Sequence, residues 1–567
     1  MGVLESDISI AKDLIEAGLS VRQFLMDRMN HSSQSQSALS RFSRQILALI
    51  FQYCTGSDFP LDSDQGHYES DLYNGESEDG DEELFESRSV LHLGLVCKSW
   101  KDAAWSTPSL WTSVTIHLNS SERNYACIRR ANAWFSRSGN LPLLFRVIHS
   151  QHRWTWTEQR ITIAPSSPSA ILLSEILVKY QRRWLLLDIQ CPSFILEELK
   201  HELLQSESWS FLSTLRANAI LPWSEETLPQ IPLLPHIKCL SLHRVSLHFI
   251  SPSSVCMLTH AELKSVSLDD CVQLVAHAPL LRSFKIENPK GPWPELDTHA
   301  PVIGSNVRSF SCEGDRVGIR ENLLDLFVFP SLEELTLNAG IFDPTIFYDS
   351  NKTKRRLLSS GCRLKKLITY VSLECFADGN LCSFLADFPS IQTLKLLSID
   401  PSSHSLSNAF FQRLSKTKLL SEESFLPELT SLTIQIEGAQ RDFSELEFPW
   451  SSVPDIFGVP NQNISSASSS LPLSEDPPRR LLRKLRIYFK YDPKLTDEEG
   501  EIEEEDSEYE YTYAGNISIP CIGSAVKKLR TLQEKGIDLQ VRYMSDEATG
   551  VDIDLIELSE RIPGLYI

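Results

Sequence analysis

Three histidines, His236, His243 and His248, lie close together in the segment PHIKCLSLHRVSLHF and are the first residues to consider as metal ligands. Protein zinc sites need three or four ligands that converge on one point. Spacings of seven and five residues do not put all three side chains on one face of a helix or of a strand. We therefore expect no metal site at these histidines.

The carboxylates, which could act as acids or bases, are concentrated in two runs. Twelve acidic residues and no Lys or Arg lie between Asp58 and Glu86, and ten more acidic residues lie between Asp497 and Glu510. Like charges at this density repel one another and cannot bury a core, so we expect solvated loops. Docking of a basic partner is the functional alternative for these runs.

Charge and motifs narrow the function class. The formal net charge is -21, and the two acidic runs account for it, which argues against nucleic-acid binding. The sequence has no glycine-rich phosphate loop, no G-x-S-x-G and no H-E-x-x-H motif. We expect a protein that is not an enzyme, with no catalytic residues, no cofactor and no metal.

Length and composition indicate a folded chain with more than one part. The 567 residues are 42% apolar, and no run of about 18 apolar residues could span a membrane. The first 18 residues include acidic side chains and no apolar leader segment. The 12 cysteines occur singly, mostly in apolar stretches, which is typical of buried thiols in a reducing compartment. We expect a cytoplasmic or nuclear protein that does not contact a membrane.

The largest part of the chain repeats one pattern, an apolar residue, two spacers, an apolar residue, one spacer and an apolar residue. In the nine main copies the spacers are polar except at Cys239 and Ile368, and five copies follow a proline. The nine copies are Ile237/Leu240/Leu242, Leu263/Val266/Leu268, Leu281/Phe284/Ile286, Val307/Phe310/Cys312, Leu332/Leu335/Leu337, Leu364/Leu367/Thr369, Ile391/Leu394/Leu396, Leu429/Leu432/Ile434 and Leu482/Leu485/Ile487. Weaker copies are Trp184/Leu187/Ile189 and Leu212/Leu215/Ala217.

This pattern predicts a stack of short strands. Each strand buries its apolar residues against a covering segment, and a single unit is stable only when its neighbours cover it. We expect an irregular leucine-rich-repeat solenoid with a parallel sheet on its concave face and a cap formed by a helix over 522–536 and a strand after it. The spacers then face outward, and the basic spacers are candidates for binding a protein substrate: Lys264, Arg282, Lys285, Arg308, Lys365 and Lys395.

Two shorter segments have apolar residues at helical spacing, 42–54 and 89–111. They contain Gln45-Ile46-Leu47, Ile50-Phe51, Leu95-Val96-Cys97-Lys98-Ser99-Trp100 and Ser106-Thr107-Pro108-Ser109-Leu110-Trp111. Together they resemble an F-box, and the following WFSRSGNLPLLFRV resembles the segment that continues it in mushroom-type F-box proteins. Phe42-Ser43 stand where that family has Leu-Pro, and the acidic stretch 55–88 separates the two helices.

The resemblance implies a non-catalytic subunit of a Skp–cullin–F-box ubiquitin ligase. On this hypothesis the F-box docks on a Skp-family adaptor, and through it on cullin, while the repeats hold an unidentified protein substrate. The adaptor-binding residues would then be Ile46, Leu47, Ile50, Phe51, Val96, Cys97 and Trp100. Two alternatives stay open: a ligase-independent scaffold whose F-box has lost docking, and a small-molecule co-ligand bound by the basic spacers.

The expected organisation is α/β with four regions. An N-terminal helix and linker occupy 1–40, and the F-box with its acidic insert 55–88 occupies 41–118. A connecting region follows over 119–180. The leucine-rich-repeat-like domain fills 181–567, with loops at 457–480 and 494–512.

Overall fold

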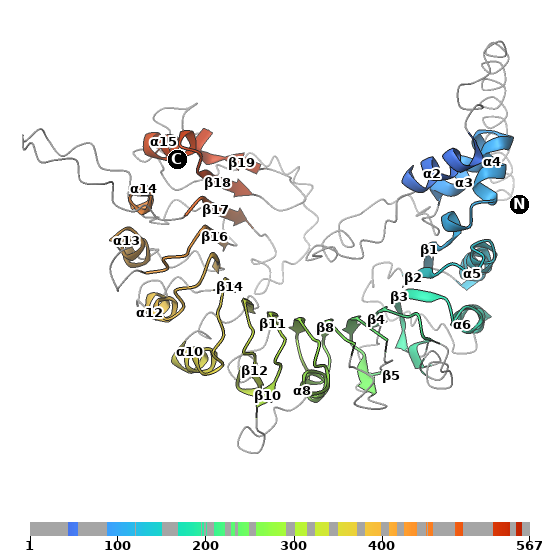
Figure 1. Ribbon diagram of the computed structural model, residues 1–567, viewed down its shortest axis with the longest axis horizontal. Coiled ribbons are helices and arrows are strands. Elements are labelled where there is room, and N and C mark those ends of the chain that lie inside the picture. The colour runs from blue at the N-terminus through green and yellow to red at the C-terminus, as the bar shows by residue number, and fades with distance from the viewer. Residues whose placement is uncertain are drawn as a thin grey trace, which may run out of the picture. The chain divides into compact units, whose positions relative to one another are not determined.

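The computed structural model describes most of the helices and strands that these patterns predict (Figure 1). The described residues are 43–54, 88–118, 121–149, 168–193, 195–197, 200, 209–220, 228–232, 236–248, 257–290, 301–314, 324–339, 350–370, 380–398, 408–416, 425–438, 450, 452–457, 482–491, 526–544 and 552–557. They fall into two compact units that divide between Ile176 and Leu177, and we describe each unit by itself.

The first unit begins with three short helices and ends with a strand–helix–strand segment. Its elements are α2 (Arg44–Cys54), α3 (Arg88–Val96), α4 (Lys98–Trp105), the 3₁₀ turn η2 (Pro108–Trp111), β1 (Ser113–Leu118), α5 (Ser121–Phe135) and β2 (Leu143–His149). Helix α6 (Pro168–Lys179) runs across the division. The region predicted as a connection, 119–180, thus contains two helices and a strand.

The three helices pack through a small apolar core. Leu47 and Phe51 of α2 are 3% and 0% exposed, and the Phe51 ring lies 5.0 Å from the ring of Trp100 in α4. Helix α3 approaches α4 closely, because a Cβ atom added at Gly94 would lie 2.4 Å from the Trp105 ring. Helix α4 ends at Trp105, two residues before Thr107-Pro108, since proline cannot continue a helix.

An aromatic cluster connects these helices to the strands of the same unit. The buried Trp111 donates its Nε1–H to the carbonyl oxygen of Ala104 at 2.9 Å, and its ring lies 4.5 Å from that of Trp134. Strands β1 and β2 pair in parallel, with Val114 opposite Phe145, and α5 connects them. The connection through α5 is long enough for a parallel pair of strands, which needs a crossover of a dozen residues or more.

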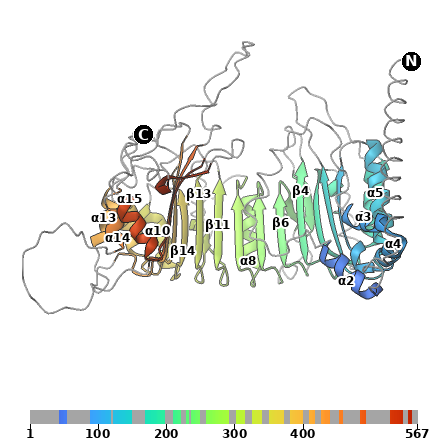
Figure 2. The same ribbon diagram turned by 90° about the horizontal axis from the view of Figure 1, so that it is seen from above.

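The second unit is built on a long, mostly parallel sheet (Figure 2). Its strands are β3 (Trp184–Pro192), β4 (Thr214–Ile220), β6 (Cys239–His243), β8 (His260–Lys264), β9 (Ser283–Glu287), β11 (Ser309–Gly314), β13 (Glu334–Ala339), β14 (Lys366–Tyr370), β15 (Thr393–Ser398), β16 (Ser431–Gly438), β17 (Lys484–Tyr491), β18 (Asp538–Met544) and β19 (Asp552–Asp554). They are neighbours in this order, and only the last pair is antiparallel.

Helices and two small strand pairs accompany this sheet. They are α8 (Leu268–His277), α10 (Ser350–Ser359), α12 (Asn380–Ala386), α13 (Asn408–Lys416), α14 (Val453–Ile456) and α15 (Val526–Glu534), with β5 (Gln230–Pro232) paired to β7 (Ser246–His248) and β10 (Val302–Ile303) paired to β12 (Phe327–Val328). Within this unit the strands line the inner side of a curve and these helices lie on its outer side (Figure 1). The parallel sheet on the concave side is therefore as predicted.

The repeat pattern sets the register of the strands. Leu335 of β13 lies opposite Leu367 of β14, which lies opposite Leu394 of β15, and all three are fully buried. The same apolar positions align along the sheet, so each repeat covers the apolar face of the one before it. The predicted strand positions are correct for eight of the nine main copies and for both weaker copies.

The copy placed at Leu263/Val266/Leu268 is wrong by five residues, because Leu263 is the third apolar position of its repeat and not the first. Strand β8 pairs Leu263 with Leu242, so the copy is Leu258/Ala261/Leu263, with the small Ala261 at its centre. Val266 and Leu268 are buried as well, but they belong to the turn and to the start of α8. Burial at those two positions imitates the strand pattern without forming a strand.

The predicted cap is confirmed at α15 and β18. The helix ends just before Gly536, whose φ of 83° is a left-handed conformation that glycine adopts without strain. Other predictions lie outside the described residues: the N-terminal helix and linker at 1–40, the acidic insert up to residue 87, and the loops at 458–480 and 494–512.

Candidate functional site

The structure divides the predicted adaptor-binding residues into core and surface. Leu47 and Phe51 are buried at one point of contact between α2 and α4, so as folded they cannot contact a partner. Their assignment to a docking surface is corrected: both residues hold the three helices together. Ile50 and Trp100 are half-buried, and each keeps part of its side chain at the surface.

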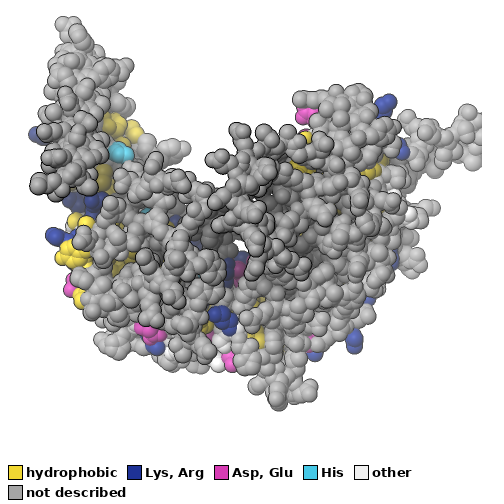
Figure 3. Space-filling view, turned by 180° about the vertical axis from the view of Figure 1, so that it is seen from behind, with side chains coloured by type: hydrophobic (Ala, Val, Ile, Leu, Met, Phe, Trp, Pro, Cys, Tyr) yellow, Lys and Arg dark blue, Asp and Glu magenta, His cyan; other side chains and the backbone are white. Residues whose placement is uncertain are grey.

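The remaining predicted residues are exposed, and two more apolar side chains join them. Ile46 is 45% exposed and Val96 is 53% exposed, and Cys97 lies at the surface between α3 and α4. Leu49 and Leu95, which the prediction did not include, are 65% and 80% exposed. Hydrophobic side chains reach the surface of this unit on the left of Figure 3. An exposed cluster of large apolar residues is typical of a protein-interaction surface.

A second apolar stripe on α2 could have identified Leu49 from the sequence. Leu47 and Phe51 are four residues apart and form the buried stripe, whereas Ile46, Leu49 and Ile50 are three and four residues apart and form another. A short helix that is apolar on both faces needs a second surface to cover it. Which stripe faces the core depends on α3 and α4, so the α2 sequence alone does not decide it.

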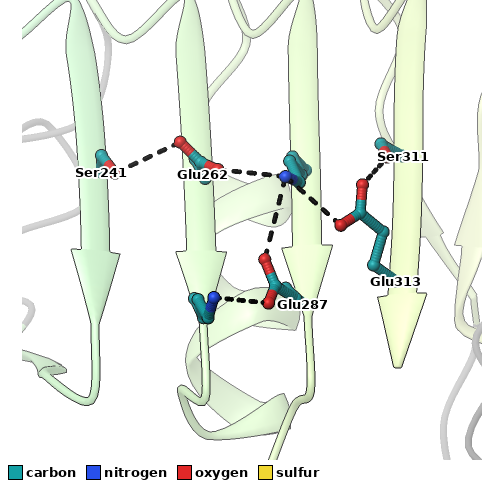
Figure 4. A network of polar contacts seen from close by, with 7 residues as sticks. Ser241, Glu262, Glu287, Ser311 and Glu313 are labelled. Carbon is teal, nitrogen blue, oxygen red and sulfur yellow. Dashed lines mark hydrogen bonds and ion pairs between the residues drawn. The ribbon is translucent and has the colours of Figure 1, made fainter. Parts of the chain in front are cut away.

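The outward face of the sheet holds a network of charged side chains (Figure 4). Lys285 of β9 contacts Glu262 of β8 at 3.3 Å and Glu313 of β11 at 3.4 Å. Lys285 also lies 3.8 Å from Glu287, which in turn pairs with Lys264 at 2.7 Å. Lys264 and Lys285, both predicted to bind a substrate, therefore pair with carboxylates of the chain itself.

Lys285 is held in its charged form by this network. Partial burial alone would lower its pKa, but Glu313, Glu262 and Glu287 together outweigh that effect and raise the pKa above the ordinary 10.5. Ser241 and Ser311 donate hydrogen bonds to Glu262 and Glu313 at the two ends of the network. The three glutamates exceed the two lysines by one charge, so this part of the face does not attract anions.

The other predicted substrate-binding residues have different environments. Lys365 pairs with Glu333 at 3.1 Å, and Lys395 lies on the outward face of β15 and has a partner of its own. Arg282 and Arg308 are exposed just before β9 and β11, and no carboxylate among the described residues pairs with them. The six predicted residues therefore do not form one basic surface.

The described residues contain no group of three or more His, Cys, Asp or Glu side chains that could hold a metal ion. His236 is exposed, His243 is half-buried, and the side chain of His248 lies outside the described residues. The prediction of buried thiols is confirmed at Cys191 and Cys271, where burial raises the pKa of each thiol. No helix within the described ranges is long and apolar enough to cross a membrane.

Comparison with known proteins assigns no family. No family model and no curated protein matches the chain. Among solved structures, the crystal structure of a TLR13–ssRNA13 complex matches with a TM-score of 0.27 and 14% sequence identity. The match covers 54% of this chain and 46% of that chain, so this chain spans less than half of the matched protein. At this identity and TM-score the likeness carries no argument about function.

Proposed function

We propose that the chain is a substrate-recognition subunit of a Skp–cullin–F-box ubiquitin ligase. Helices α2 and α3 of the first unit bind a Skp-family adaptor, and the repeats of the second unit bind a protein substrate. The observation that carries the proposal is the exposure of Leu95 and Val96, at 80% and 53%, in the segment that most resembles an F-box.

The energetics support a partner for these helices. Fully burying one Leu or Val side chain contributes about 1.5–3 kcal/mol, so leaving both in water forgoes a large part of the stability of a small unit. The core beneath them is nevertheless intact, because Leu47, Phe51, Val90 and Ala103 are all at most 3% exposed. The exposed residues are therefore available for binding without any rearrangement of the helices.

On this proposal the chain positions other proteins and performs no bond chemistry. The adaptor would cover the apolar surface of α2 and α3, and the parallel sheet would present polar side chains to the substrate. Surfaces formed by side chains from many consecutive repeats are commonly used for protein recognition. A chain whose repeats bind a partner while the helices bind no adaptor would instead be a ligase-independent scaffold.

Calorimetric titration of the full chain with a purified Skp-type adaptor tests the proposal. We expect submicromolar binding. The double variant Leu95→Asp/Val96→Asp removes two apolar contacts and adds charge at the surface, so we expect affinity to fall at least about 30-fold. No binding by a folded wild-type chain would overturn the proposal in favour of the scaffold.

Leu358→Asp is the matched control. Leu358 lies on α10 of the repeat unit and is 46% exposed, so its substitution adds one negative charge, against two in the double variant, at a surface leucine outside the F-box-like helices. It should leave adaptor affinity unchanged. An equal loss in the control would mean that the adaptor recognises charge or general hydrophobicity rather than α2 and α3.

A further inference from the structure

A tight turn precedes six strands of the repeat unit, β4, β9, β11, β13, β15 and β16. The N–H of the first apolar residue donates to the carbonyl oxygen three residues earlier, as in Leu212 to Trp209 at 3.2 Å and Leu281 to Ala278 at 3.1 Å. Pro279, Pro330, Pro389 and Pro427 occupy the second position of four of these turns, where their fixed φ is favourable. The residue just before the first apolar position is exposed or half-buried in each of these turns.

The residues at this position in successive repeats form a continuous row, which we call the turn row. In strand order it contains Phe211, His236, Met257, Leu280, Asn306, Ser331, Arg363, Ser390 and Glu428. Neighbouring strands lie about 4.8 Å apart, so side chains of the row can reach one another. Arg363 and Glu428 do so, because Arg363 Nη2 lies 3.0 Å from Glu428 Oε1 across the strand that carries Ser390.

The apolar members of the turn row are confined to its earlier half. In the later half, polar side chains bind the previous repeat: Ser331 Oγ donates to the Ser305 carbonyl oxygen at 2.7 Å, and Ser390 Oγ donates to that of Leu364 at 2.8 Å. In the earlier half, Asn306 Nδ2 makes the same kind of bond to the Pro279 carbonyl oxygen at 2.7 Å, and His236 is exposed. Phe211, Met257 and Leu280 also belong to this half and are 59%, 41% and 44% exposed. Apolar side chains can make no such bond, so repeat-to-repeat packing does not account for them.

A second row runs parallel to the first, two residues later in each repeat, and we call it the entry row. It contains Lys238, Thr259, Arg282, Arg308, Glu333, Lys365, Gln392, Thr430 and Arg483. Backbone hydrogen bonds align it, because Arg308 N donates to Arg282 O at 2.8 Å and Glu333 N donates to Arg308 O at 2.8 Å. Neighbours in this row are therefore also one strand spacing apart.

The two halves of the entry row differ in whether their charged side chains are paired. Lys365 and Glu333 neutralise each other in the later half. Lys238, Arg282 and Arg308, in the earlier half, have exposed side chains that pair with no carboxylate among the described residues. Three cations without a carboxylate partner among the described residues thus lie just before β6, β9 and β11, beside the half of the turn row that contains Phe211, Met257 and Leu280.

We propose that this edge of the sheet, from β4 to β11, binds an acidic peptide segment with interspersed apolar residues. The four strand spacings cover about 19 Å, which is the length of about six extended residues. An extended segment presents alternate side chains to opposite sides, so apolar residues would contact the turn row and carboxylates the entry row. Charge complementarity selects an acidic segment over a basic or neutral one.

The edge is a better site for an acidic segment than the outward face of the sheet. On that face Lys264 and Lys285 already pair with glutamates, and an incoming carboxylate would have to displace Glu287 or Glu313. At the edge no such competition exists within the described residues. Peptide binding there stands independently of the helical unit, and only its role in selecting a ligase substrate rests on the proposed function.

Fluorescence anisotropy with the full chain tests this inference. The probe is a labelled peptide with eight alternating Glu and Leu residues between Gly-Ser flanks, and the control peptides replace Glu by Lys or Leu by Ser. We expect only the Glu-Leu probe to bind at micromolar concentration, with affinity that falls as salt rises. Equal binding of the Glu-Leu and Lys-Leu peptides would overturn the inference, because charge would then play no part.

Variants at the two rows locate the site. Arg282→Glu/Arg308→Glu should weaken binding at least about tenfold, and Phe211→Ser/Leu280→Ser should weaken it severalfold. The matched control is Arg483→Glu, which reverses an exposed charge at the same row position before β17. An equal loss in Arg483→Glu would overturn the location. Circular dichroism checks folding, and Arg282→Gln/Arg308→Gln, with a milder loss expected, replaces any variant that does not fold.

Adaptor titration of the same variants separates the two proposals. Arg282→Glu/Arg308→Glu should bind the adaptor as the wild-type chain does. A chain that binds the adaptor but not the Glu-Leu peptide overturns the edge site alone. A chain that binds the peptide but not the adaptor supports the edge site and overturns the ligase proposal alone.

Discussion

The helical unit and the repeat unit treat large apolar residues in opposite ways. In the repeats, Leu335, Leu367 and Leu394 are fully buried because each strand is covered by its neighbours and by the segments behind the sheet. In the helical unit, Leu49 of α2 and Leu95 of α3 are 65% and 80% exposed because three short helices offer too little surface to cover every apolar side chain. A repeated element therefore buries its apolar residues against its neighbours in the chain, whereas the three short helices leave large apolar side chains at the surface.

Among single truncations, we expect the largest loss of stability for a side chain in the middle of the sheet. Leu394→Ala in β15 should lower the free energy of unfolding of the repeat unit by about 3–5 kcal/mol, because the cavity is enclosed by neighbouring strands. Hydrogen exchange of the amides in β14 to β16 measures the loss. Gln392→Ala, at an exposed position two residues earlier, should change stability by less than about 0.5 kcal/mol.

A slightly smaller effect is expected for the core of the helical unit. Phe51→Ala should cost about 3 kcal/mol, since it removes a fully buried ring and its contact with Trp100. Exchange should accelerate at the amides of α2 and α4. Leu49→Ala on the same helix is the control, and a similar cost there would contradict the division of α2 into a buried and an exposed stripe.

The contrast between the two units can be predicted from the sequence in part. The polar spacers around Phe284 and Ile286 were enough to predict a strand, because strict alternation of apolar and polar residues is typical of a strand with one buried face. The copy at Leu263 was misplaced because Ala261 is a weak apolar signal and Val266 a strong one. Local pattern identifies a buried face but does not decide which of two overlapping patterns forms the strand.

The candidate surfaces required the structure for a different reason. Lys285 and Arg282 are both basic spacers three residues apart, yet one pairs with three carboxylates and the other with none among the described residues. The pairing depends on which residue stands opposite on the next strand, and loops of variable length set that register. The sequence of one repeat therefore cannot distinguish a paired cation from an available one.

The smallest effect is expected on the outward face of the sheet, where Lys285→Met leaves Glu262 and Glu313 without their cation and leaves Glu287 with Lys264 alone. We expect a loss of about 1–2 kcal/mol at neutral pH. Because the folded state raises the pKa of Lys285 above 10.5, its contribution is complete below that pH and is lost as pH rises through the raised value.

Denaturant titrations of wild type and Lys285→Met from pH 7 to pH 11 measure this contribution. The difference between them should stay constant up to about pH 10 and then shrink. A difference that instead grows with pH would contradict the assignment of a charged Lys285 at the centre of the network. Gln273→Met on α8, an exposed position away from the network, is the control and should show no pH-dependent difference.

The central claim is that the exposed apolar surface of α2 and α3 binds a Skp-type adaptor. Hydrogen exchange of the full chain, with and without saturating adaptor, tests it most directly because it reports which amides the partner covers. The account predicts protection concentrated at 43–54 and 88–105, with the repeat strands unchanged. Protection that falls on the repeat strands instead, or no protection anywhere, would contradict it.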